Sequence, residues 1–126
     1  MKKLLFCLVT FCCIAVTASA QQKPVQIARI STPTVQCDMC KKTIEELLKR
    51  YDGVMSVSVK LNKDSTKRET TIKYLTDRVN EETLKAAIAN AGYDADDIVA
   101  NPDAYKALPK CCKKPEDGGG MGKPKQ

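Results

Sequence analysis

The sequence has no histidine, no tryptophan and only two phenylalanines among its 126 residues. Without an imidazole base, the chain cannot build a Ser-His-Asp or Cys-His catalytic arrangement. Every zinc site that uses a histidine ligand is excluded for the same reason. The net charge of +6 is too small and too dispersed, and aromatic residues are too few, for a nucleic-acid-binding surface. We therefore expect no nucleic-acid partner and no enzyme of these classes.

The first three of the seven cysteines lie in an N-terminal segment that has the pattern of a signal peptide. Lys2 and Lys3 precede an apolar run over residues 4–16, and Ala18-Ser19-Ala20 forms a small-x-small cleavage pattern. The run is too short for a transmembrane helix of about 20 residues. We predict that residues 1–20 are a signal peptide cleaved after Ala20. The mature chain, with no transmembrane segment, is then expected to be periplasmic or secreted.

Cys7, Cys12 and Cys13 lie inside this apolar run, where cysteine serves as a small hydrophobic residue. A lipid-modified cysteine would need a small residue before it, whereas Phe11 precedes Cys12. Removing residues 1–20 leaves 106 residues, four cysteines and a net charge of +4. Any role of cysteine in the mature chain therefore belongs to these four.

Composition divides the remaining chain into four segments. Residues 21–24 form a polar leader, and residues 25–100 contain the periodic apolar pattern of a folded domain. Residues 101–108 predict a short helical extension, because an asparagine that can cap a helix is followed by proline. Residues 109–126 are rich in lysine, glycine and proline and contain two cysteines, which predicts a flexible tail.

The apolar period within the domain alternates between that of strands and that of helices. Strands are predicted over residues 25–32, 54–61 and 70–74, the last two forming a hairpin. Helices are predicted over residues 38–51 and from the capping Asn80 to Ala91. Their apolar stripes are Ile44, Leu47, Leu48 and Tyr51 in the first helix and Leu84, Ala87, Ile88 and Ala91 in the second.

This order predicts an α+β, ferredoxin-like βαββαβ sandwich, in which two helices cover one face of an antiparallel sheet. The final strand is expected to be weak, because Asp94-Ala95-Asp96-Asp97 is poor strand material and only Ile98 and Val99 follow it.

Cys37-Asp38-Met39-Cys40 lies between the first predicted strand and the first predicted helix. Backbone N–H groups in the first helical turn and the helix dipole stabilise thiolates there. Two thiolates without histidine or paired carboxylates favour soft ions such as Cu(I) and Hg(II). Two cysteines alone do not complete a tetrahedral zinc site. The spacing therefore predicts a soft-metal site.

Two other interpretations of the motif remain open. The pair of cysteines is also compatible with a structural or functionless disulfide in an exported chain. A periplasmic thiol-disulfide oxidoreductase would use the same Cys-x-x-Cys spacing. The thioredoxin-like arrangement, however, needs a strand-helix unit ahead of the motif, and here the motif follows the first strand and has no tryptophan beside it.

Three motifs, in order, resemble the heavy-metal-associated domain found in copper chaperones and mercury-binding proteins. They are Thr34-Val35-Gln36-Cys37-Asp38-Met39-Cys40, Gly53-Val54-Met55-Ser56-Val57-Ser58-Val59 and Ala91-Gly92-Tyr93. The resemblance implies that Cys37 and Cys40 are the metal ligands and that Val35 replaces an apolar methionine buried under the metal loop. Tyr93 then corresponds to an aromatic residue near that loop, or equally to a core aromatic residue.

The resemblance also implies a partner. Members of this family pass ions by ligand exchange between paired Cys-x-x-Cys sites, so a protein metal donor or acceptor, such as a metal transporter, is expected. Lys41 and Lys42 directly follow the motif and are the residues we expect to contribute to docking, although a simple solvated surface is the alternative.

Cys111 and Cys112 stand outside the resemblance. Adjacent cysteines rarely bond to each other, because the peptide geometry opposes ring closure. One interpretation is a flexible tail with oxidisable thiols. Another is a second pair of soft ligands, which either binds metal separately or folds back to give a three- or four-thiolate site with the first pair. A four-thiolate site would make Zn(II) a further possible ion.

Overall fold

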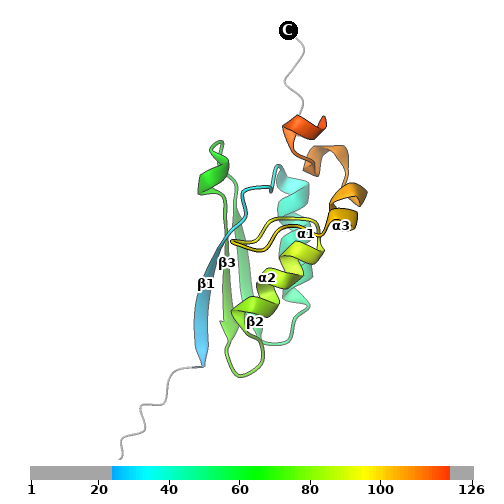
Figure 1. Cartoon of the computed structure of the whole chain (residues 1–126). Coiled ribbons are helices and arrows are strands. Elements are labelled where there is room, and N and C mark those ends of the chain that lie inside the picture. The colour runs from blue at the N-terminus through cyan, green and yellow to red at the C-terminus, as the bar shows by residue number, and fades with distance from the viewer. Residues whose placement is uncertain (1–23, 120–126) are drawn as a thin grey trace, which may run out of the picture.

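The computed structural model describes residues 24–119 and consists of one three-stranded antiparallel sheet with helices on one side (Figure 1). The strands are β1 (Val25–Ser31), β2 (Val54–Lys60) and β3 (Glu69–Leu75), and β3 lies between the other two. The hairpin predicted from the sequence is therefore confirmed as the β2–β3 pair. The predicted signal peptide lies outside the described residues.

One face of the sheet is buried and the other is not, because apolar residues alternate along each strand. Ala28 and Ile30 of β1 are buried, and so are Val57 and Val59 of β2. A pair of buried threonines, Thr32 and Thr70, also lies on the core side, where their hydroxyl oxygens are 3.0 Å apart in a hydrogen bond. This bond satisfies two polar groups that would otherwise be costly to bury.

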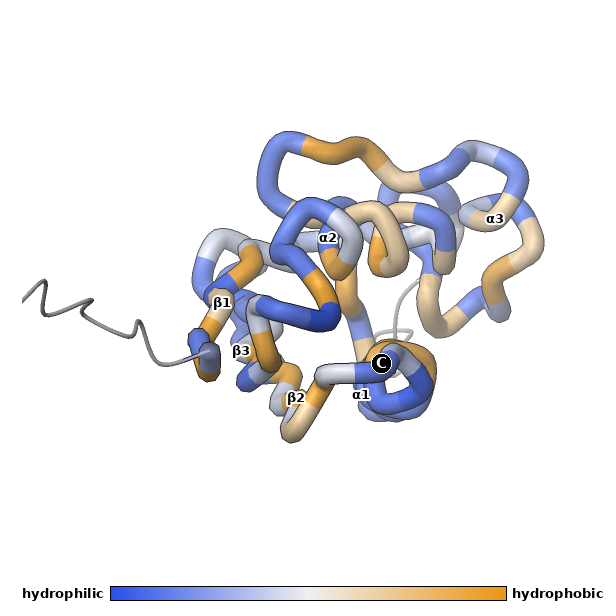
Figure 2. The backbone as a smooth tube through the Cα atoms, turned by 90° about the horizontal axis from the view of Figure 1, so that it is seen from below, coloured by the Kyte–Doolittle hydropathy of each residue, from blue (hydrophilic) through white to orange (hydrophobic). Residues whose placement is uncertain are grey.

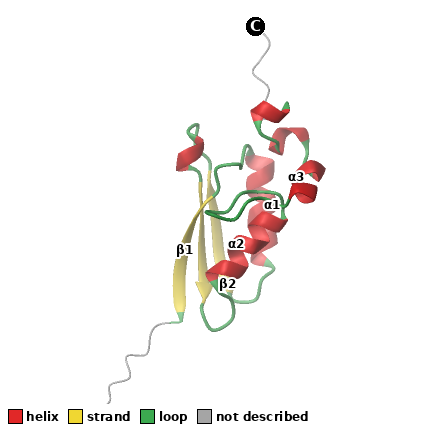
Figure 3. Ribbon diagram, in the orientation of Figure 1, coloured by secondary structure: helices red, strands yellow, loops and turns green. Residues whose placement is uncertain are grey.

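Helices α1 (Asp38–Lys49) and α2 (Glu81–Asn90) cover the buried face (Figures 2 and 3). The buried positions of α1 are Cys40, Ile44 and Leu48, which follow one another at four-residue spacing. The cap predicted for α2 is present, since the Asn80 side chain accepts a hydrogen bond from the Thr83 amide at 2.8 Å. The predicted ferredoxin-like arrangement of two helices on one sheet face is confirmed.

The final strand of that arrangement is reduced to a tight turn with one isolated bridge, Ala95 to Ile98. Asp96 has a positive φ of 52° and exchanges two hydrogen bonds with Ser31 at the edge of β1. Its carboxylate also pairs with Lys85, which contacts Glu81 and Glu82 as well. Burial lowers the pKa of Lys85, but the three carboxylates outweigh it and the net pKa is raised.

The C-terminal extension begins with α3 (Pro102–Ala107), which Asn101 caps as predicted. Two short 3₁₀ turns follow, η2 (Lys110–Cys112) and η3 (Pro115–Asp117), and η2 contacts α1 near the N-terminal end of that helix (Figure 1). The sequence predicts a flexible tail from residue 109 onward. Up to Gly119 the described chain forms these short turns, and the buried Cys112 side chain and the Tyr105 hydroxyl contact the rest of the structure there.

Candidate metal site

The two cysteines of the motif sit where β1 leads into α1. Cys37 is the N-cap residue, with an extended backbone and no side-chain capping hydrogen bond. Cys40 lies in the first helical turn and is fully buried, and Cys37 is only 7% exposed. The uncapped N-terminus of α1 therefore presents its partial positive charge to this pair of sulfurs.

Four cysteine sulfurs converge at this point. The Cys37 sulfur lies 3.3 Å from that of Cys40 and 3.9 Å from that of Cys112. The Cys111 and Cys112 sulfurs are 3.9 Å apart, and those of Cys37, Cys111 and Cys112 all lie within 4.8 Å of one another. The chain thus brings both cysteine pairs together, although 72 residues separate Cys40 from Cys112.

Cys40 and Cys112 are joined in a disulfide, whereas Cys37 and Cys111 carry free thiols. The Cys-x-x-Cys pair is therefore not closed on itself. Interaction with the Cys37 sulfur, together with burial, raises the pKa of the Cys111 thiol. The structure is that of a partly oxidised site, in which two of the four sulfurs are bonded to each other.

The loop before Cys37 is held by one buried side chain and by hydrogen bonds. The Val35 side chain of this loop is fully buried in the core, at the position where the resemblance places an apolar methionine. The Thr34 hydroxyl accepts a hydrogen bond from the Asp94 amide at 2.9 Å, and the Gln36 side chain donates to the Thr34 carbonyl. The guanidinium of Arg68 donates to the Pro33 carbonyl at 3.0 Å. These bonds position the loop without any metal.

Tyr93 is a core residue, and charges on the cysteines of the site affect the ionisation of its hydroxyl. Its side chain is 1% exposed, and its hydroxyl has no hydrogen-bond partner within the described part of the chain. Burial is the main cause that raises its pKa to about 12, and charges at Cys37 and Cys111 contribute to that increase. Both interpretations offered by the sequence therefore apply to this one side chain.

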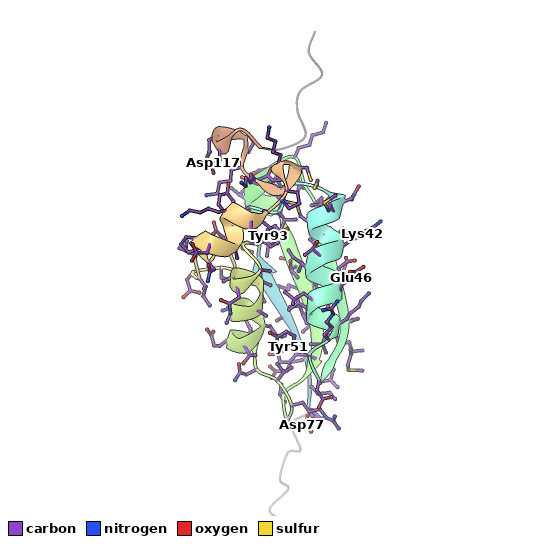
Figure 4. The ribbon with its side chains drawn as sticks, turned by 90° about the vertical axis from the view of Figure 1, so that its right-hand side faces the viewer. Lys42, Glu46, Tyr51, Asp77, Tyr93 and Asp117 are labelled. Atoms are coloured by element: carbon purple, nitrogen blue, oxygen red, sulfur yellow. A yellow bond between two sulfur atoms is a disulfide. The ribbon has the colours of Figure 1, made fainter. Side chains whose placement is uncertain are left out.

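Lys41 and Lys42 follow the site along α1. Lys41 is half-buried and Lys42 is exposed, and Figure 4 shows Lys42 on the side of α1 away from α2. Both amino groups lie on the helix that carries Cys40, next to a site that concentrates negative charge when its thiols ionise.

The sequence pattern of the heavy-metal-associated domain matches residues 29–94, which is more than half of the chain. The chain belongs to the heavy-metal-associated domain family. The match ends at Asp94, so the extension with Cys111 and Cys112 lies beyond the part that defines the family.

Relatives of this heavy-metal-associated domain include a copper chaperone CopZ of Staphylococcus haemolyticus strain JCSC1435. It is 34% identical over 65 residues, which cover 52% of this chain and 90% of the relative. A solved CopZ metallochaperone is 27% identical with a TM-score of 0.50, covering 56% of this chain and 98% of that one. Oxidised MerP from Ralstonia metallidurans CH34 is 25% identical, also with a TM-score of 0.50, covering 57% of this chain and 94% of that one.

Sequence reasoning did not anticipate two features of this heavy-metal-associated domain. The thioether sulfur of Met39, inside the motif, lies 3.9 Å from the Cys111 sulfur and is half exposed. Gly92 has a φ of +99°, and a Cβ there would lie 3.0 Å from the backbone nitrogen of Tyr105. The glycine thus permits α3 to approach the domain. The Ala-Gly-Tyr motif is a short stretch of sequence and does not reveal a contact with a residue farther along the chain.

No helix among residues 24–119 is long and apolar enough to cross a membrane.

Proposed function

We propose that the protein is an exported carrier that captures Cu(I) or Hg(II) between the Cys37 and Cys40 thiolates and passes the ion to a partner. The observation that carries this proposal is the 3.3 Å approach of the two sulfurs at the N-terminus of α1. Sulfur-only ligation favours soft ions, and the helix N-terminus offsets the negative charge of a bis-thiolate complex. The name of one relative, a copper chaperone, supports copper as an ion to test, and the sulfur-only chemistry of the site adds Hg(II).

Transfer would proceed by ligand exchange with a protein metal donor or acceptor, such as a metal transporter. An incoming partner thiolate adds to the bound ion, and one of the two protein thiolates then leaves and takes up a proton. Lys41 and Lys42 directly follow Cys40 on α1 and would attract an acidic partner surface. This transfer makes and breaks only metal–sulfur bonds, and we propose it as a carrier function without enzymatic activity.

The test is an anaerobic competition experiment on the purified, reduced protein with Cu(I), Hg(II) and Zn(II) in turn, with thiols counted before and after loading. We expect tight binding of one soft ion per chain and a loss of free thiols. The C37S/C40S variant should bind none tightly. An Asp38→Asn variant is the matched control, since it changes an exposed residue of the motif but keeps both thiols and the Met39 thioether. Absence of tight soft-ion binding by the wild-type chain would overturn the proposal.

Export is tested separately. We expect the protein recovered from the periplasmic fraction of an expressing bacterium to begin at Gln21 by intact mass. Recovery in the cytoplasm with residues 1–20 still attached would contradict the predicted signal peptide.

A second candidate function is thiol-disulfide exchange, which one observation favours. The free Cys37 sulfur lies 3.3 Å from Cys40, which is bonded to Cys112. Attack of a Cys37 thiolate on Cys40 would form a Cys37–Cys40 disulfide and release the Cys112 thiolate, with no net change in oxidation state. Turnover with a disulfide substrate and a dithiol reductant would support an oxidoreductase, and stoichiometric reaction without turnover would count against it.

A further inference from the structure

The C-terminal extension is built to hold its two cysteines against the motif. The Asn101 amide donates to the Ala89 carbonyl at the end of α2, at 2.8 Å, which anchors the start of α3. Farther along, the Tyr105 hydroxyl accepts a hydrogen bond from the Lys114 amide at 2.9 Å and donates to the Asp117 carboxylate. Tyr105 lies in α3, before η2, and its two partners follow η2 in the chain. These hydrogen bonds therefore hold the two ends of the segment that carries Cys111 and Cys112 together.

Burial distinguishes these cysteines from thiols in a solvated tail. Cys112 is 1% exposed and belongs to the same core cluster as Cys37 and Cys40. Cys111 is partly buried and packs against that cluster. The extension has therefore inserted a cysteine into the core of the domain at the one place where two other cysteines already lie.

The sulfur separations fit shared coordination of one ion. A tetrahedral site with metal–sulfur bonds of about 2.3 Å places its sulfurs about 3.8 Å apart, and a linear two-sulfur site places them about 4.6 Å apart. The separations from Cys37 to Cys40 and to Cys112 are 3.3 and 3.9 Å, and Cys111 lies 3.9 Å from Cys112. These values match the edges of a tetrahedron better than the ends of a linear complex.

A second observation points to a negatively charged ligand set. The Tyr93 hydroxyl is buried and has no hydrogen-bond partner within the described part of the chain. A buried donor without an acceptor is costly, and it becomes favourable when a charged acceptor is present. Tyr93 belongs to the same core cluster as Cys37, Cys40 and Cys112. A metal-thiolate centre within this cluster would bring a charged acceptor to the neighbourhood of that hydroxyl.

We infer that, in the reduced protein, Cys111 and Cys112 join Cys37 and Cys40 to hold a single soft metal ion in one four-sulfur site. The inference rests on the proposed function, because it concerns the same cargo ion. The extension then supplies half of the ligands, and it must detach before a partner thiolate reaches the ion.

The disulfide in the structure is the oxidised form of this site. Reduction of the Cys40–Cys112 bond by a dithiol takes up two electrons and two protons and yields two protein thiols and one disulfide of the reductant. Each cysteine that then binds the ion releases its proton to water. Metal and disulfide therefore exclude each other at Cys40 and Cys112.

The experiment loads the reduced, anaerobic protein with Cu(I) and measures three quantities. They are the ion-to-chain ratio, the affinity in competition with a Cu(I) chelator, and the number of sulfur ligands from X-ray absorption. C111S/C112S is compared with C37S/C40S, and K110S/K113S is the matched control that alters the same turn but keeps all four thiols. Circular dichroism and urea unfolding verify that each variant is folded.

We expect one ion with four sulfur ligands in the wild type and in K110S/K113S. C111S/C112S should keep one ion with two sulfur ligands and bind it at least about 100-fold more weakly. Even substitutions of residues that only hydrogen-bond a metal ligand lower metal affinity by about 10- to 100-fold. If C111S/C112S instead keeps wild-type affinity and ligand number while C37S/C40S loses binding, the four-sulfur site is wrong and the carrier function stands. If the wild type binds no Cu(I) tightly, the carrier function itself fails.

Discussion

Replacing Tyr93 with phenylalanine removes one oxygen atom and acts in opposite directions on the empty and the loaded protein. In the disulfide-bonded chain that the structure describes, the Tyr93 side chain is 1% exposed and its hydroxyl has no hydrogen-bond partner among the described residues. Leaving a buried donor unsatisfied costs about 1–3 kcal/mol, so Tyr93→Phe should stabilise this form by about that amount. In the loaded protein the hydroxyl is expected to donate to a metal-bound thiolate, and the substitution should weaken binding.

The magnitudes set the assays. With a urea dependence of about 1 kcal/mol/M for a chain of this size, a gain of about 1 kcal/mol raises the unfolding midpoint by about 1 M. A hydrogen bond to a charged group contributes about 1.5–3 kcal/mol, which corresponds to a loss of about 10- to 100-fold in Cu(I) affinity. Urea unfolding with a metal chelator present measures the first quantity, and chelator competition measures the second. A Tyr93→Phe protein that is less stable when empty, or binds Cu(I) as tightly as wild type, refutes the reasoning.

The same variant has a distinct alkaline signature. The folded-state pKa of Tyr93 is raised to about 12 from its ordinary value of 10.0, so the unfolded chain releases this proton first as pH rises. Stability is therefore lost between pH 10 and pH 12, by about 1 kcal/mol at pH 11. Tyr93→Phe should lack this loss, and the wild-type-minus-variant difference in urea midpoint isolates it from the other tyrosines. A difference that does not change from pH 9 to pH 11 would contradict the assigned shift.

Three further substitutions test how the domain holds its extension and its edge. Gly92→Ala should cost about 1–3 kcal/mol by urea unfolding, because its φ is +99° and the new methyl meets the α3 backbone. After reduction of the Cys40–Cys112 disulfide, the variant should also expose the Cys112 thiol to alkylation more than the wild type does. Asp96→Ala should destabilise by about 1–2 kcal/mol through the lost bond to β1, with Asp96→Gly intermediate because glycine tolerates the positive φ. Thr70→Val leaves the buried Thr32 hydroxyl unpaired and should cost about 1–3 kcal/mol in the same assay, whereas the T32V/T70V double variant should recover part of that loss.

The sequence predicts the parts of this fold that depend on local periodicity. The four-residue spacing of Ile44 and Leu48 and the alternation along β2 and β3 each report a buried face directly, so the helices, the hairpin and the layer order follow. The weakness of the final strand was also predictable, because acidic residues occupy its position. Asp96 forms instead a turn that bonds to the edge of β1.

The location of Cys112 was not predictable in this way. Residues 109–119 contain no apolar period, and their order comes from single contacts with distant groups, such as the Tyr105 hydroxyl with the Lys114 amide. The pairing of Cys40 with Cys112 depends on where α3 directs the chain, which in turn depends on the absence of a side chain at Gly92. Spacing within the sequence carries no information about such contacts, so the fold-back of the second cysteine pair was one open alternative among several.

The connection between Cys40 and Cys112 also changes the entropy of the unfolded chain. It closes a loop of 72 residues that contains most of α1 and all of β2, β3, α2 and α3, but not β1. In the chain-entropy description, a cross-link over such a loop lowers the free energy of the native state relative to the unfolded chain by about 4 kcal/mol. A metal ion shared by the two cysteine pairs would close the same loop, so loading and disulfide formation would each fasten the two ends of the domain. Delivery of the ion would then reopen that loop and lower the free energy of unfolding of the empty, reduced protein.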